Sequence, residues 1–160
     1  MDGFEQIYSE NSAKVYRYLL ALCRDEFLAQ ELTSETFLRA IIKIDSFRGD
    51  CDVSVWLCQI AKNLFYSHCR KEKRKRSEVC NSDESDFVLK IDDREQSAAI
   101  MKYVHELSEP YKEVFLLHVF AQIELKDISV LFQKSESWAR VTFYRAKARI
   151  IEKLREDGIL

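Results

Sequence analysis

Six basic side chains follow one another near the end of the chain at spacings that distribute them around one helix. Between residues 138 and 155 they are accompanied by a single acid, Glu152. Arginine and lysine placed in this way can neutralise DNA phosphates and donate hydrogen bonds to base edges in the major groove. The predicted chemistry is therefore recognition of nucleic acid without covalent change. The six residues are Arg140, Arg145, Lys147, Arg149, Lys153 and Arg155.

A second basic stretch lies between residues 62 and 76, where seven basic residues accompany one acid. Trp56, Phe65, Tyr66 and His68 precede this stretch or interleave with it. Aromatic faces can stack on unpaired bases while nearby cations neutralise the phosphates. A helix that ends in a solvated basic tail is the simpler alternative, but the aromatic residues favour binding of nucleic acid.

Two helices joined by a short turn must position the C-terminal basic residues. Leu125, Ile128 and Leu131 recur at helical spacing, and Ser135 is a good N-cap for the helix that follows. A short helix, a turn and a basic second helix are typical of a helix-turn-helix, which lays its second helix in the major groove. The alternative is an amphipathic hairpin whose charges are only solvated.

The second helix of this pair has one apolar stripe. The stripe recurs at helical steps and comprises Ala139, Phe143, Ala146, Ile150 and Leu154. At about 100° per residue, Val141, Tyr144 and Arg145 point away from it. Trp138 lies at the side of the stripe, and we expect it to pack against the first helix rather than to contact DNA.

One or two helices are predicted over residues 3–22, and one helix each over about 27–44 and 53–75. In the helix over residues 27–44, Leu28, Leu32, Ile41 and Ile44 are the candidate core positions. Its opposite side carries Glu31, Ser34, Glu35 and Leu38, which alone would indicate no more than a solvated face.

Composition and charge predict an all-α protein of two small domains. The 160 residues include three Gly and one Pro, and 47% are apolar. Residues 77–96 carry seven acids and two bases, whereas the flanking segments carry a slight positive charge. We therefore expect domains at 1–76 and 97–160, the second a helix-turn-helix domain, joined by an acidic linker at 77–96.

Several other functions are disfavoured by what the sequence lacks. No apolar run would span a bilayer and no signal peptide opens the chain, so a cytoplasmic protein without membrane insertion is expected. The five cysteines, at irregular spacing without a CxxC motif, are expected to be reduced. Neither a metal site nor a cofactor is predicted. The sequence has no glycine-rich phosphate loop or nucleophile elbow, so we expect that the protein is not an enzyme.

In their order, these motifs resemble the extracytoplasmic-function (ECF) sigma factors of bacterial RNA polymerase. Residues 29–40, AQELTSETFLRA, look like the helix with which that family docks on the β′ clamp coiled coil. Residues 44–50, IDSFRGD, followed by Trp56 and by residues 60–63, resemble the segment that opens the promoter and reads its −10 element. The helix-turn-helix corresponds to the reader of the −35 element, and residues 107–117 to its lead-in.

The resemblance implies a dissociable promoter-specificity subunit whose partners are core RNA polymerase, through the β′ clamp and the β flap, and promoter DNA. An anti-sigma factor is a plausible further partner. The acidic linker would lie in the RNA channel. The implied docking residues are Glu31, Ser34, Glu35 and Leu38. The implied −10 contacts are Trp56, Lys62, Asn63, Tyr66, Arg70, Lys73 and Arg74. The implied −35 contacts are Arg140, Val141, Tyr144, Arg145, Lys147 and Arg149.

The chain departs from the family pattern at several of these positions. Ser34 stands where the docking helix usually has Gln, and Gln133 stands in a turn that often holds Gly. Thr142 replaces a basic residue of the second helix. Two other hypotheses remain open from the residues alone: an autonomous operator-binding regulator, and a metal or redox sensor that uses the cysteines.

Overall fold

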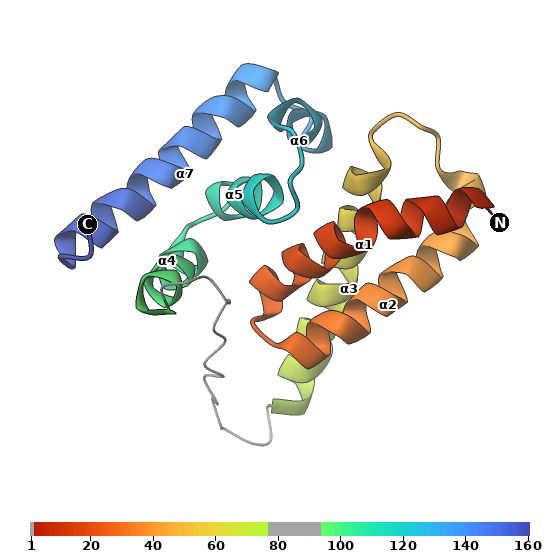
Figure 1. Cartoon of the computed structure of the whole chain (residues 1–160), viewed down its shortest axis with the longest axis horizontal. Helices are drawn as coiled ribbons and strands as arrows, with labels where there is room; N and C mark the ends of the chain where they lie inside the picture. Colours follow the sequence, from red (N-terminus) through yellow and green to blue (C-terminus); the bar gives the residue numbers. More distant parts are fainter. Residues whose placement is uncertain (1, 77–93) are drawn as a thin grey trace. The chain divides into compact units, whose positions relative to one another are not determined.

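The computed structural model describes residues 2–76 and 94–160, and every regular element in these two ranges is helical. The described residues belong to two compact units, one on each side of residues 77–93 (Figure 1). The predicted all-α class is thus confirmed. Most of the predicted acidic linker lies outside the described residues. None of the described helices is both long enough and apolar enough to span a membrane.

The first unit contains three packed helices, α1 (Asp2–Cys23), α2 (Glu26–Lys43) and α3 (Val53–Arg76), and the short 3-10 helix η1 (Ile44–Ser46). The chain turns sharply between α1 and α2 because Arg24 adopts a left-handed backbone conformation with φ 55°. Asp25 then caps α2 by accepting a hydrogen bond from the backbone N–H of Leu28 at 3.1 Å.

The core of the first unit corrects one of the predicted faces. Ile41 was predicted to be buried, but 51% of it is exposed. The buried face of α2 contains two threonines instead, and Thr36 satisfies its hydroxyl by donating to the Leu32 carbonyl at 2.7 Å. Because such a threonine needs no outside partner, it can occupy a core position that apolar periodicity alone does not predict. The buried residues of α2 are Ala29, Leu32, Thr33, Thr36, Phe37 and Ala40.

The start of α3 is fixed by a polar cap and an aromatic contact. Asp52 accepts from the backbone N–H of Ser54 at 2.9 Å and also from the Ser54 hydroxyl. Phe47, in the preceding loop, packs its ring 4.9 Å from that of Trp56. These contacts hold the loop against the helix that carries the second basic stretch.

The second unit consists of α4 (Arg94–Glu106), α5 (Tyr111–Val119), α6 (Leu125–Leu131) and α7 (Glu136–Glu156). Helix α4 begins inside the stretch that was predicted to be linker. The long helix α7 packs against the other three, and Figure 1 shows it as the blue ribbon that ends the chain. His118 is structural, as lone histidines usually are. Its Nδ1 lies 2.8 Å from the Ile123 carbonyl, and its ring packs edge-on to Phe143.

Candidate nucleic-acid interface

The turn between α6 and α7 is closed by backbone hydrogen bonds. Gln133 takes a left-handed conformation with φ 55°, and its N–H donates to Val130 while the N–H of Lys134 donates to Ser129. This pair of bonds is a Schellman cap, for which glycine is the usual residue. Gln133 therefore makes the turn that the family builds with Gly, although a side chain adds strain there.

The second helix begins as the sequence predicts. The Ser135 hydroxyl accepts from the N–H of Trp138 at 3.1 Å, so Ser135 is the N-cap of α7. The indole of Trp138 is half-buried, with its ring 5.3 Å from that of Phe132 at the end of α6. The expected packing of Trp138 against the first helix is therefore found.

The two faces of α7 separate as expected. The apolar stripe turns inward, with Phe143 stacked 5.9 Å from Phe115. Thr142 is also buried, so the position where the family has a second basic residue faces the core in this chain. The structure leaves all six of the residues implied in −35 contact exposed along α7: Arg140, Val141, Tyr144, Arg145, Lys147 and Arg149.

Two of these six already have partners within the second unit. Arg140 donates from Nη2 to Glu136 Oε1 at 2.9 Å. Arg149 places its guanidinium carbon 4.1 Å from the centroid of the Tyr111 ring. Neither Glu136 nor Tyr111 was singled out from the sequence, although the i, i+4 spacing of Glu136 and Arg140 was a usable signal.

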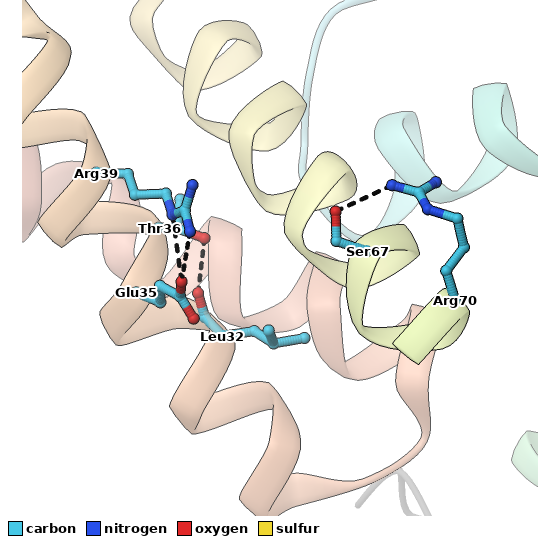
Figure 2. Close-up of polar contacts among 6 residues, drawn as sticks. All are labelled: Leu32, Glu35, Thr36, Arg39, Ser67 and Arg70. Atoms are coloured by element: carbon cyan, nitrogen blue, oxygen red, sulfur yellow. Dashed lines mark hydrogen bonds and ion pairs between the residues drawn. The ribbon is translucent and has the colours of Figure 1, made fainter. Parts of the chain in front are cut away.

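The outward face of α2 carries the four implied docking residues. Glu31, Ser34 and Leu38 are exposed, and the half-buried Glu35 accepts from Arg39 at 3.0 Å (Figure 2). Three large apolar residues on the same helix are also exposed, although the sequence did not identify them as surface residues. Phe27, Ile41 and Ile42 are 75%, 51% and 73% exposed, and Leu38 is 60% exposed. These four residues are called the apolar docking face below, after the role that the resemblance implies for this helix. Exposed apolar groups gathered in this way usually mark an interaction site.

A groove of about 300 Å³ lies between α2 and α3. Its α2 wall includes Glu31 and Glu35, and its α3 wall includes Asn63 and Lys71. Two of the four implied polymerase contacts, Glu31 and Glu35, thus border the same groove as Asn63, the implied base-reading residue. In Figure 2 the Glu35–Arg39 pair marks the α2 wall and Ser67 marks the α3 wall; Arg70, which donates to Ser67, does not line the groove.

The implied −10 residues are brought together along one side of α3. At about 100° per residue, Trp56, Asn63, Arg70 and Arg74 fall within an arc of about 40°. Trp56 is half-buried against Phe47, whereas Asn63 and Arg70 are exposed. Lys62, Tyr66 and Lys73 lie beside this arc.

The cysteines among the described residues bear on the hypothesis of a metal or redox sensor. Among residues 2–76 and 94–160, no three His, Cys, Asp or Glu side chains are grouped as a metal site would require. Burial raises the pKa of the Cys58 thiol to about 12, so this residue behaves as a small apolar side chain. Cys80 lies outside the described residues.

Comparison with known proteins agrees with both units. Residues 7–75 match the family Sigma-70 region 2, and residues 97–150 match Sigma-70, region 4. The chain is 32% identical to the ECF RNA polymerase sigma factor SigM of Bacillus subtilis (strain 168), with 91% of each protein covered. It is 30% identical to the ECF RNA polymerase sigma factor BldN of Streptomyces coelicolor, over 98% of this chain and 62% of that protein.

A solved structure shares the fold. The sigma factor RpoE of Bartonella quintana, in complex with the anti-sigma factor NepR, gives a TM-score of 0.75 at 21% identity. The match covers 97% of this chain and 98% of that one. These comparisons give no support to an autonomous operator-binding regulator. The chain belongs to the ECF family of RNA polymerase sigma factors, the subunits that direct core RNA polymerase to promoters and promote DNA melting when transcription begins.

Proposed function

We propose that residues 1–76 bind core polymerase and the −10 element, that residues 97–160 bind the −35 element, and that residues 77–96 link the two. The observation that carries this proposal is the apolar docking face of α2, defined above. A face with large exposed apolar groups beside Glu31 and Glu35 fits a partner that buries apolar area and offers basic side chains. The β′ clamp coiled coil is that partner, and the β flap engages the second unit.

At the −10 element, α3 captures unpaired bases. Trp56 and Tyr66 provide aromatic faces, and Asn63 hydrogen-bonds to one base edge. The phosphates are neutralised by Lys62, Arg70, Lys73 and Arg74. Stacking and base contacts offset the few kcal/mol needed to unstack each base, so recognition and melting occur together.

At the −35 element, the outward face of α7 enters the major groove. Arg140, Val141, Tyr144 and Arg145 face the bases, because they lie near the start of the helix and away from its buried stripe. Lys147 and Arg149 face the backbone, where cationic side chains fix the register without reading sequence.

The remaining roles follow from the same assignment. Polymerase performs the chemistry, so this subunit is not itself an enzyme. It acts in the cytoplasm, together with polymerase. An anti-sigma factor is a further partner, by analogy with the Bartonella sigma factor that was solved in complex with one. Such a partner would compete with polymerase or with promoter DNA for the faces described above.

The test of the proposal is capture of core polymerase by variants of the docking face. Glu35→Lys reverses a charge and Ile42→Ser removes apolar area, so both should weaken capture at least several-fold. Neither side chain belongs to the buried core, since Ile42 is exposed and Glu35 is half-buried, so the helical circular-dichroism signal should be unchanged. Glu10→Lys is the matched control, since Glu10 is an exposed acid on the neighbouring helix α1. Wild-type capture by both docking-face variants would refute the assignment.

A further inference from the structure

An ion pair at the start of α7 joins Arg140, a proposed −35 contact, to Glu136, which has no role in the proposed function. Glu136 is the first residue of the helix, and its Oε1 accepts from Arg140 Nη2 at 2.9 Å. Both side chains remain more than half exposed, at 56% and 59%. The pair therefore lies on the surface, at the end of the helix that a helix-turn-helix presents to base edges.

The bond leaves most of the arginine available. A guanidinium has five N–H donors in a rigid planar fork, and the bond to Glu136 uses one nitrogen, Nη2. Its other donors can still bind O6 and N7 of a guanine, which is the commonest specific contact in the major groove. An arginine with no such partner could instead turn to a phosphate, which carries no sequence information.

The charges around Glu136 favour this arrangement. A carboxylate in the first turn is stabilised by the positive end of the helix dipole. The pKa of Lys126 on α6 is raised chiefly by Glu124, then by Asp127 and least by Glu136. Placement of Glu N-terminal to Arg at i, i+4 is the more favourable order on a helix. The position of Glu136 in the first turn and its bond to Arg140 thus place a carboxylate where it can orient the guanidinium.

We propose that Glu136 is a positioning residue for −35 recognition, holding the Arg140 guanidinium in the orientation that reads one guanine. The inference rests on the proposed role of α7. Glu136 contributes selectivity rather than affinity: as a negative charge near the DNA it weakens binding to every sequence slightly, and it strengthens the preference for guanine at one position.

The experiment uses the complete sigma factor with core polymerase and a set of promoters that carry each base in turn at every −35 position. Arg140→Ala should reduce the preference for guanine over the other bases at one position by about tenfold, a reduction typical of the loss of a bidentate contact. Glu136→Ala should lose several-fold at the same position while binding the other sequences equally well or better. In an Arg140→Ala background, Glu136→Ala should change base preference no further.

Two variants separate orientation from general electrostatics. Glu136→Gln keeps an oxygen that can accept from the guanidinium, so it should retain more of the guanine preference than Glu136→Ala. Glu156→Ala removes an equally exposed acid that pairs with Lys153 at the other end of α7, and it should leave base preference unchanged. Thermal unfolding of each variant checks that the helix is intact, since Ser135 still caps it.

The outcomes distinguish this inference from the proposed function. If Arg140→Ala changed base preference at no −35 position, the assignment of α7 would itself be wrong. If Arg140→Ala lost guanine preference but Glu136→Ala kept it, Arg140 would read DNA without Glu136. Equal weakening of all sequences by Glu136→Ala would likewise overturn the positioning role.

Discussion

The guanidinium of Arg149 lies over the ring of Tyr111, 4.1 Å from its centroid. Tyr111 is the first residue of α5, so this cation–π contact joins α5 to the long helix α7. The resemblance implies that Arg149 contacts the DNA backbone. In the free protein, its guanidinium instead stabilises the contact between two helices of the second unit.

This contact should be measurable as a coupling between the two residues. Arg149→Ala and Tyr111→Leu should each lower the free energy of unfolding of the second unit by about 0.5–1 kcal/mol, the range for exposed cation–π pairs. The double variant should lose less free energy of unfolding than the sum of the losses of the two single variants. Unfolding can be followed by Trp138 fluorescence in a Trp56→Phe background, where Trp138 is the sole tryptophan. Strict additivity would show that the contact stabilises nothing.

Stability and readout should separate at the start of α7. Trp138→Ala removes an indole that packs on Phe132, and it should cost about 1–3 kcal/mol, less than for a fully buried ring. Arg140→Ala should leave the unfolding midpoint unchanged and reduce −35-dependent transcription. The comparison uses far-UV circular dichroism and transcription from one promoter. A Trp138→Ala variant that melted like wild type but lost transcription would identify the indole as a DNA contact.

The helix-turn-helix could be predicted from the sequence because its signals are local. A regular apolar stripe and the capping serine Ser135 define α7 without knowledge of any other element. Even the glycine-like turn at Gln133 lies where the sequence places a break. The contact between Tyr111 and Arg149 could not be predicted in this way, because it depends on how α5 packs against α7.

The face of α2 shows a different limit. Ile41, near the end of the helix, was predicted to be a core residue, yet it is 51% exposed while Thr36 is fully buried. The helix buries threonines that bond to their own backbone, and it leaves larger aliphatic groups exposed. Hydropathy alone predicts that such large aliphatic residues lie in the core of their own chain.

Asn63 and Arg74 should respond differently because one is proposed to read a base and the other to bind phosphate. Asn63→Ala should flatten the preference at one position of single-stranded −10 DNA, a loss of about 1–3 kcal/mol of discrimination. Arg74→Ala should weaken binding to all sequences alike. It should also reduce the slope of log affinity against log salt concentration by about one unit. Affinities measured for the polymerase complex across a salt series test both. A uniform loss with Asn63→Ala would remove its base-reading role.

The cap of α3 should make the first unit sensitive to acid. The pKa of Asp52 lies below its usual range, chiefly because the Ser54 hydroxyl donates a hydrogen bond to the carboxylate. Burial raises the pKa, whereas the Ser54 N–H and the charge of Lys14 lower it further. When the pKa of a carboxyl is lower in the folded than in the unfolded protein, its ionised form stabilises the fold. This stabilisation is complete above the unfolded pKa of about 3.9 and is lost as the pH falls through the folded-state pKa.

Asp52→Asn tests this relationship, because asparagine is also a good N-cap but does not titrate. The midpoint difference between wild type and Asp52→Asn should stay constant from neutral pH to about pH 5 and shrink below about pH 4. Trp56 fluorescence in a Trp138→Phe background reports the first unit alone. Asp50→Asn, an exposed residue of the same loop, should retain the wild-type pH dependence. A midpoint difference that did not change between pH 7 and pH 3 would show that the charge of Asp52 adds nothing to its hydrogen bonds with Ser54.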